Sequence, residues 1–368
     1  MLDLYTLYHF AERLYTGFSR HLPGGYALPP LQMVIELTYR CNLKCGFCFQ
    51  RRQMEQLHLR RGGTAQELSL EEIQQIIAQT PPWCLIIFTG GEPFVRSDIL
   101  DILAYAARKR RCHFVTNGAL ITPEAARALV DLGVLSVGFS IDGDRATHDR
   151  VRGVPGTFDR AIAAMREVRQ HRQNTRRRWP LIGFKITITA SNVRDLTHII
   201  EMARQAGVDY CTYQIINTSL LTSGLQLSDE MTPYFACPDP IEGFDLEALE
   251  GQLRRLDQMR SDGAPAIRLS PNIPRGEIVA HYANELDVRS YTCYAPWSGV
   301  NVSAYGDVFP CFNYRIGSLR ESTLQALWNG PRYRAFRQAL RRRGLFAGCV
   351  GCCDLVYRGN GELHSGKR

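Results

Sequence analysis

Short apolar runs rich in β-branched residues alternate with helical segments along residues 31–216, and this alternation constrains the fold more than any other feature. Continuous apolar runs are typical of parallel strands buried on both faces. Strand–helix repeats form either a doubly wound sheet or a barrel, and composition leaves both open. The predicted strands are Met33–Leu37, Leu85–Phe88, His113–Thr116, Leu135–Ile141, Leu181–Thr189 and Tyr210–Ile215.

Capping residues mark several of the intervening helices. Ser69 and Glu72 form a capping box before an apolar stripe of helical period. Thr122 precedes a proline at a first helical position. Asn192 is predicted to cap a helix that ends at Gly207. These signals place one helix after each of three predicted strands.

The 368 residues contain no apolar stretch of the ~20 residues that span a bilayer, and the first residues do not resemble a signal peptide. We therefore expect a cytoplasmic protein. Twelve cysteines in such a chain favour metal ligation or redox chemistry over disulfides. Cys84, Cys112 and Cys211 lie in apolar runs and are predicted to be core residues.

The net charge of +8 comes almost entirely from arginine. Basic stretches at Arg169–Arg178 and Arg337–Arg343 could attract an acidic partner. Because no aromatic interleaving or nucleic-acid motif accompanies them, we favour solvated helix faces, and nucleic acid is not an expected partner.

Cys41, Cys45 and Cys48 follow the first predicted strand closely. Three thiolates on one loop can hold three corners of a cubane iron–sulfur cluster and leave the fourth iron open to a small molecule. A zinc site is the alternative, although zinc usually takes a second cysteine pair or histidines.

The C-x3-C-x2-C spacing, with Phe47 before the last cysteine, resembles the signature of the radical S-adenosylmethionine (radical SAM) family. The resemblance implies a partial (β/α)6 barrel of the TIM type with the cysteine loop at its carboxyl face. It also implies a [4Fe–4S] cluster at Cys41, Cys45 and Cys48 that binds S-adenosylmethionine. Reductive cleavage would then give a 5'-deoxyadenosyl radical that abstracts hydrogen from a substrate C–H bond.

Later strand ends carry further matches to this family. Gly90-Gly91-Glu92-Pro93 is similar to its GGEP motif, which implies contact with the methionyl amino group. The segment from Ser140 to Arg152 resembles that of radical SAM enzymes with SPASM or Twitch domains, and implies contacts to the ribose or carboxylate. The predicted S-adenosylmethionine-binding residues are Phe47, Gly90, Gly91, Glu92, Pro93, Asn117, Ser140, Arg152 and Gln214.

A second cysteine group lies near the C-terminus. A hairpin turning near Tyr305-Gly306 would bring Cys293 and Cys311 together, and Cys349 and Cys352 form a C-x2-C pair. Four thiolates suit zinc as well as an iron–sulfur cluster. Behind a radical SAM core this segment resembles a Twitch domain, a shortened SPASM module, which implies one fully ligated auxiliary [4Fe–4S] cluster. Cys353 could replace Cys352, although the spacing favours Cys352.

The expected organisation has five parts: an N-terminal helical extension at 1–30, the barrel core at 31–216, a connecting and substrate-facing region at 217–289, the auxiliary cluster domain at 290–357 and a polar tail at 358–368. A helical stripe in the extension could rest on a membrane surface or a partner, but we favour packing on its own domain, because the segment lacks a strongly basic face. The stripe consists of Leu4, Leu7, Tyr8, Ala11, Leu14 and Tyr15.

The expected function is that of a radical SAM oxidoreductase, since an auxiliary cluster can accept an electron from a substrate radical. We expect net oxidation of a small molecule such as a sugar, an aminocyclitol or another natural-product intermediate. By family analogy the electron donor is flavodoxin or ferredoxin. The alternatives are a peptide- or protein-modifying maturase or epimerase, and a non-catalytic iron–sulfur or zinc protein.

Overall fold

The computed structural model describes residues 4–48, 66–218, 240–259, 265–311 and 314–359, with side chains described from residue 11 onward. Most of the predicted polar tail, parts of the region 217–289 and the side chains of Leu4 and Leu7 lie outside these ranges.

A curved sheet forms the centre of the described fold, in the order β11-β10-β9-β1-β2-β3-β4-β5-β6-β7. The strands from β1 to β7 pair in parallel, each beside the next in the chain. The predicted partial barrel and its six strands are confirmed, and β7 adds a strand that the sequence analysis did not predict. The strands are β1 Gln32–Glu36, β2 Leu85–Thr89, β3 Cys112–Thr116, β4 Ser136–Ser140, β5 Leu181–Thr187, β6 Tyr210–Gln214 and β7 Ala266–Ser270.

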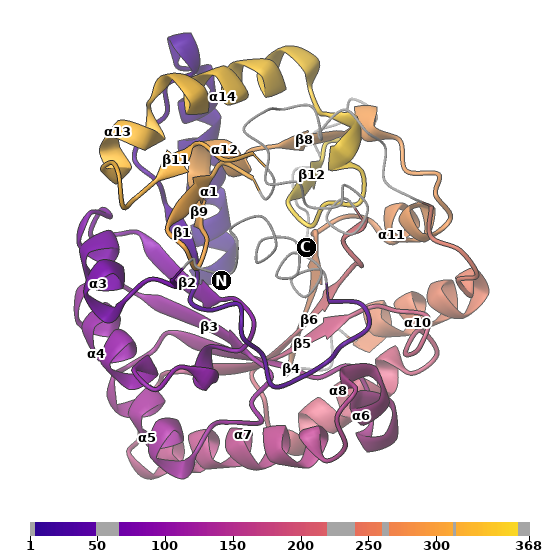
Figure 1. Ribbon diagram of the computed structural model, residues 1–368. Coiled ribbons are helices and arrows are strands. Elements are labelled where there is room, and N and C mark those ends of the chain that lie inside the picture. The colour runs from indigo at the N-terminus through magenta and orange to yellow at the C-terminus, as the bar shows by residue number, and fades with distance from the viewer. Residues whose placement is uncertain (1–3, 49–65, 219–239, 260–264, 312–313, 360–368) are drawn as a thin grey trace.

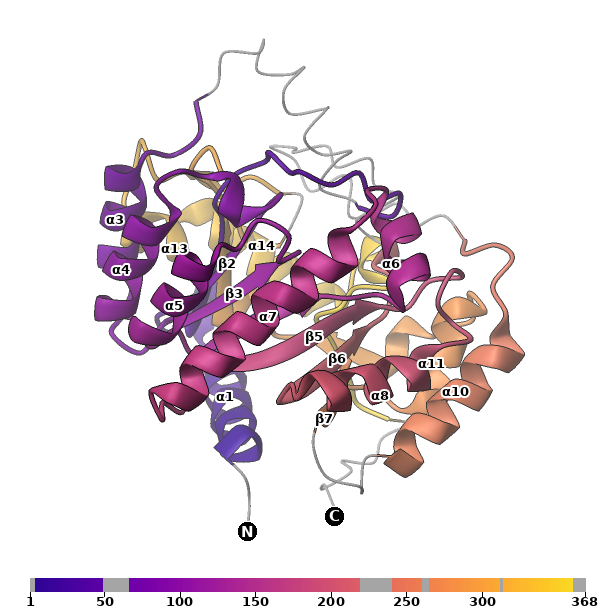
Figure 2. The same ribbon diagram turned by 90° about the horizontal axis from the view of Figure 1, so that it is seen from below.

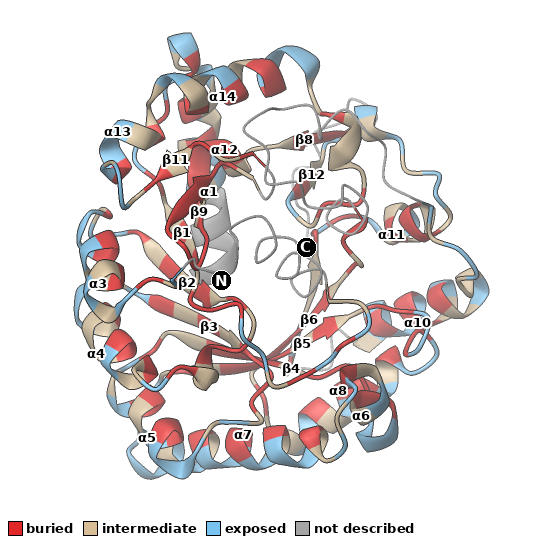
Figure 3. Ribbon diagram, viewed as in Figure 1, coloured by how far each residue is buried: buried red, intermediate tan, exposed pale blue. Residues whose placement is uncertain are grey.

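Helices cover the convex side of this sheet (Figures 1 and 2). Figure 3 shows their buried faces turned toward the strands and their exposed faces turned outward. This amphipathic arrangement places the core between strands and helices. The helices are α3 Leu70–Ala78, α4 Ile99–Lys109, α5 Pro123–Asp131, α6 Arg145–Arg152, α7 Thr157–Asn174, α8 Leu196–Ala206, α10 Leu246–Met259 and α11 Arg275–Tyr282.

Two of the predicted helix starts are confirmed and one is wrong. Ser69 and Glu72 form both hydrogen bonds of the capping box of α3, and Thr122 caps α5. Asn192 does not cap α8, because this helix begins four residues later at Leu196 and has Asp195 at its N-cap position. Its buried amide instead donates to the carbonyls of Asp142 and Thr187, both at 2.9 Å. Asn192 therefore joins the carboxyl ends of β4 and β5.

The predicted C-terminal hairpin is present, and it extends the main sheet. Strands β9 (Gly299–Val302) and β10 (Asp307–Phe309) are antiparallel, and β9 also pairs in parallel with β1. The remaining elements are β8 Tyr291–Cys293, α12 Ala295–Ser298, β11 Gly317–Ser318, α13 Leu324–Trp328, α14 Pro331–Arg343 and β12 Leu355–Tyr357, with β8 and β12 in a separate two-stranded sheet.

The predicted core cysteines Cys84, Cys112 and Cys211 are buried. The expectation that Arg337–Arg343 forms a solvated face is wrong for Arg337, which is fully buried. Its guanidinium lies 4.2 Å from the ring centre of Trp328 and 4.0 Å from that of Tyr333. It donates to the carbonyls of Pro296 and Trp328. Buried polar groups cannot bond to water, so these hydrogen bonds supply the partners that both sides need.

The N-terminal helix α1 (Leu4–His21) packs against α12 through part of its surface. Thr16 and Ser19 are buried, whereas Leu14 is 60% exposed and Phe18 is 63% exposed. The predicted packing of the apolar stripe on its own domain is therefore wrong for Leu14. Within the described ranges, no helix has both the length and the apolar character needed to cross a bilayer.

Candidate S-adenosylmethionine and iron–sulfur sites

The cysteine loop leaves β1 at the carboxyl edge of the sheet. Cys41 is exposed, Cys48 is half-buried and Cys45 is buried. Burial, together with nearby Glu92, Cys45 and Cys48, raises the pKa of the Cys41 thiol to about 11. Thiol donors so close together suit a soft cation such as iron, which lowers the pKa of a coordinating thiol.

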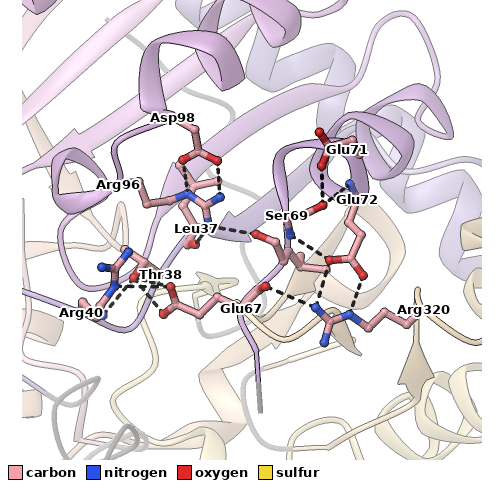
Figure 4. A network of polar contacts seen from close by, with 11 residues as sticks. Leu37, Thr38, Arg40, Glu67, Ser69, Glu71, Glu72, Arg96, Asp98 and Arg320 are labelled. Carbon is pink, nitrogen blue, oxygen red and sulfur yellow. Dashed lines mark hydrogen bonds and ion pairs between the residues drawn. The ribbon is translucent and has the colours of Figure 1, made fainter. Parts of the chain in front are cut away.

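A polar network fixes the residues between β1 and Cys41 (Figure 4). The Glu67 carboxylate accepts from the Thr38 hydroxyl at 2.8 Å and from the Tyr39 amide at 2.7 Å. Arg96 donates to the carbonyls of Leu37 and Leu68, both at 3.0 Å. The sequence analysis missed Glu67 and Arg96, because neither belongs to a motif.

The same network reaches the C-terminal part of the chain. Arg320 forms an ion pair with Glu72 at 2.7 Å and donates to the carbonyls of Gln66 and Glu67. Residues separated by about 250 positions therefore hold the start of the cysteine loop.

The Gly90-Gly91 turn packs against the cysteine loop. The Gly91 amide donates to the Thr38 carbonyl at 2.7 Å, and the Glu92 amide donates to that of Arg40 at 2.9 Å. A Cβ on Gly91 would lie 2.2 Å from the Arg40 oxygen, and Gly90 has φ +126°. Both glycines are therefore required by backbone contact between the two loops.

Glu92 connects this turn to the end of β3. Its carboxylate is 1% exposed and accepts from the Thr116 hydroxyl and the Asn117 amide, both at 2.7 Å. Burial raises the pKa of Glu92, and these hydrogen bonds oppose the rise. The Asn117 side chain donates to Asn42 at 2.8 Å, so three loops at the carboxyl edge are held together.

Arg152, the last residue of α6, lies beside the cysteine loop. It forms an ion pair with buried Asp142 at 2.6 Å and donates to the Cys45 sulfur at 3.8 Å. Its guanidinium carbon lies 5.4 Å from the ring centre of Phe47. Its buried Nε has no hydrogen-bond partner among the described residues. The structure thus leaves one donor of Arg152 available for a ligand at this edge.

A cavity of about 480 Å³ opens between the cysteine loop and the carboxyl ends of β5 and β6, a volume typical of small-molecule sites. Among the described residues that line this cavity, Phe47 alone was predicted to bind S-adenosylmethionine. Gly90, Glu92, Asn117, Ser140 and Gln214 lie outside its walls. The lining residues are Gly46, Phe47, Arg150, Val151, Thr189, Ala190, Ser191, Ile216, Ile241, Glu242, Phe244 and Tyr282.

The C-terminal cysteines converge from separate elements. Cys293 ends β8, Cys311 follows β10, and Cys349 and Cys352 flank a turn after α14. Burial raises the pKa of the Cys293 thiol, and Cys349 and Cys311 are close enough to raise it further. The thiols of Cys352 and Cys353 lie within 4.8 Å of each other and of an oxygen of Asp354. This donor set fits a thiolate-bound metal or cluster.

Two family models match the chain, one for the radical SAM superfamily over residues 35–183 and one for the SPASM iron–sulfur cluster-binding domain over residues 293–353. The chain belongs to the radical SAM superfamily. The predicted family is thus confirmed: this is a radical SAM enzyme with a C-terminal SPASM domain. Its cofactors are S-adenosylmethionine and a [4Fe–4S] cluster, with auxiliary iron–sulfur binding in the SPASM domain.

Curated relatives of this radical SAM enzyme have different named activities. The Fe-coproporphyrin III synthase of Methanosarcina barkeri is 34% identical over 50% of the chain, a match that spans 44% of that relative. The pre-heme d1 synthase of Dinoroseobacter shibae is 27% identical over 98% of the chain and 88% of its own length. The PqqA peptide cyclase of Granulibacter bethesdensis is 25% identical over 84% of the chain and 76% of its own length.

The fold is also that of a solved radical SAM structure. Streptococcus suis SuiB, crystallised with its precursor peptide SuiA, superposes with a TM-score of 0.61 at 16% identity, over 90% of this chain and 70% of SuiB. At this identity the likeness concerns the fold alone.

Proposed function

We propose that Cys41, Cys45 and Cys48 hold the radical SAM [4Fe–4S] cluster. When bound, the cluster and S-adenosylmethionine supply a 5'-deoxyadenosyl radical that removes hydrogen from a C–H bond. The convergence of three thiols on one loop, fastened by Glu67 and by the Gly90-Gly91 turn, supports this assignment. The chain's own part is to orient the ligand and exclude water, while the cofactor supplies the difficult chemistry.

We propose that S-adenosylmethionine lies along the carboxyl edge, with its nucleoside part in the 480 Å³ cavity beside Phe47. Gly90, Gly91 and Pro93 would shape the backbone that receives the methionyl group, and Ser140 and Gln214 would contact the ligand from β4 and β6. Arg152 would direct its unpaired Nε at a carboxylate, a favourable charge-assisted contact.

Glu92 and Asn117 are not proposed to contact the ligand through their side chains, because these side chains already bond to protein groups. We propose that they position the loops and present neighbouring backbone groups to the ligand.

We propose one auxiliary [4Fe–4S] cluster, bound by Cys293, Cys311, Cys349 and Cys352. Their mutual electrostatic influence and burial support this set. The test is iron and zinc analysis of the anaerobically reconstituted protein, with Cys349→Ser beside Cys353→Ser as its matched control. We expect about eight irons per chain, about four in Cys349→Ser and no loss in Cys353→Ser. Four irons and one zinc in the wild type would contradict the proposal.

We propose a small-molecule substrate of the tetrapyrrole class, oxidised at a side chain. The observation that carries this proposal is the match to pre-heme d1 synthase along nearly the full length of both chains. The 5'-deoxyadenosyl radical would take one hydrogen atom from the substrate and the auxiliary cluster would take one electron. Loss of a proton to water would then leave the oxidised product. Flavodoxin or ferredoxin would be the external reductant.

A peptide substrate is the second candidate, because the PqqA peptide cyclase match also spans most of the chain. The deciding experiment incubates the reduced holoenzyme and S-adenosylmethionine with Fe-coproporphyrin III deuterated in its side chains, or with deuterated candidate peptides. Deuterium in 5'-deoxyadenosine from the porphyrin would support the tetrapyrrole proposal, and deuterium from a peptide alone would overturn it. If no reaction produced 5'-deoxyadenosine, the proposed cleavage of S-adenosylmethionine by this enzyme would be contradicted.

A further inference from the structure

This chain uses arginine for almost all of its positive charge, and lysine occurs at four positions only: 44, 109, 185 and 367. Lys185 lies in the middle of β5, inside the sheet. A lysine there is unusual, because buried cations are costly unless they are paired.

The strand register shows which way Lys185 points. Its neighbours Phe184 and Ile186 are fully buried in the core that faces the helices, whereas Lys185 keeps partial exposure. Because successive side chains alternate between faces, Lys185 projects from the concave face. Its methylenes lie over Gly138 of β4, where an added Cβ would come within 2.8 Å of them.

A second cation projects from the same row of the sheet. Lys185 is in register with Thr212 of β6, and Thr212 is in register with Arg268 of β7. The guanidinium of Arg268 lies 4.4 Å from the ring centre of Tyr210. Arg268 is close enough to lower the pKa of Lys185, and both cations help to lower that of His113.

Within the described residues, the side-chain ammonium of Lys185 makes no hydrogen bond or ion pair. Cys353, beside the proposed auxiliary cluster ligands, is close enough to raise the pKa of Lys185. The concave face therefore carries two neighbouring cations, one of them without a protein carboxylate. Such an arrangement is matched by a ligand that supplies the missing negative charge.

We propose that Lys185, with Arg268 beside it, binds a carboxylate of the substrate inside the barrel. This inference rests on the proposed function and names a substrate contact for it. The subsite holds the ligand in place and takes no part in bond breaking. The bound molecule would then lie on the concave face of the sheet, close to Cys353.

The test uses the scarcity of lysine. Reductive ¹³C-methylation of the holoenzyme keeps the lysine charges and gives few methyl resonances, and the Lys185→Arg variant identifies that of Lys185. Succinate and coproporphyrin III, a porphyrin with several carboxylates, are the two probes. We expect both to shift the Lys185 resonance saturably and to leave that of Lys109 unchanged.

Binding of coproporphyrin III, followed by its fluorescence, supplies the second measurement. Lys185→Met should weaken binding at least tenfold, and Lys185→Arg should stay within about threefold of wild type because it keeps the charge. Circular dichroism shows that each variant is folded. A response to succinate without porphyrin binding would support the subsite and overturn the tetrapyrrole substrate. No response of Lys185 to either probe, or equal porphyrin binding by Lys185→Met, would overturn the subsite.

Discussion

Glu67 shows how much a single carboxylate contributes to the cysteine loop. It accepts hydrogen bonds from two consecutive residues that lead into Cys41, and Arg40 lies 3.6 Å from the same group. Hydrogen bonds to a charged acceptor contribute more than neutral ones, since the ionised oxygen attracts the donor more strongly. The loop conformation therefore depends on a residue far outside the cysteine motif.

We expect Glu67→Ala to lower the iron content of the reconstituted protein by about half and to destabilise the loop by about 2 kcal/mol. Iron analysis and the thermal unfolding midpoint measure these effects. Glu71→Ala is the matched control, because Glu71 is an exposed acid that bonds only to Ser69 among the described residues. Equal iron content in both variants would contradict the assigned role.

A second residue-scale prediction concerns acid stability. Burial, together with the charge of Lys185, lowers the pKa of His113 from 6.5 to about 3. Between these values the unfolded chain binds the proton that the folded protein does not, so stability falls as the pH falls below about 6.5. His113→Gln removes this contribution.

The unfolding midpoint of His113→Gln should therefore drop less than that of wild type between pH 7 and pH 5, by the equivalent of about 1–2 kcal/mol. Thermal unfolding at the two pH values measures the difference. The same drop in both proteins would show that His113 does not titrate as its burial implies.

At the scale of elements, the loops after β1, β2 and β3 act as one unit. Backbone hydrogen bonds join the first two, and Glu92 and Asn117 join the second to the third and the third to the first. A change in one loop is therefore transmitted to the others, although the strands below them stay in place.

Gly91→Ala tests this coupling, because its Cβ would lie 2.2 Å from the Arg40 oxygen. We expect iron content to fall several-fold as the cysteine loop is displaced. Gly46→Ala is a control on the cysteine loop itself, since nothing lies within 4 Å of the added Cβ. Iron content unchanged in Gly91→Ala would show that the two loops move independently.

At the scale of the whole molecule, the barrel and the C-terminal segment form one sheet. The pairing of β9 with β1 joins them through the backbone, and Arg320 joins them through side chains. Arg337 adds a third connection, since it donates to carbonyls of residues 25, 296 and 328.

We expect Arg337→Met to lower the stability of the whole chain by about 3 kcal/mol, because buried carbonyls lose their donor. The unfolding midpoint is the measurement, and Arg342→Met, an exposed position on the same helix, is the control. A midpoint equal to that of the control would contradict a structural role for Arg337.

Local periodicity and spacing were enough to predict the six strands and the two cysteine groups. The partial barrel followed only from the resemblance to the radical SAM family, because strand–helix alternation also fits a doubly wound sheet. Glu67, Lys185 and Arg337 were not predicted, since their importance arises from partners that only the folded chain brings near. Asn192 was misassigned for the same reason: its amide bonds to β4 and β5, where helix capping was expected from its local context.

The pairing of β1 with β9 also has a consequence for how the protein is made. During translation β1 leaves the ribosome early, but its second neighbour follows only about 260 residues later. At ~5–20 residues per second, that strand waits with one open edge for tens of seconds. Arg320 arrives later still, so the loop that bears Cys41, Cys45 and Cys48 acquires its final surroundings only after residue 320 has been made. Stable iron loading should accordingly follow the synthesis of the segment that contains β9 and Arg320.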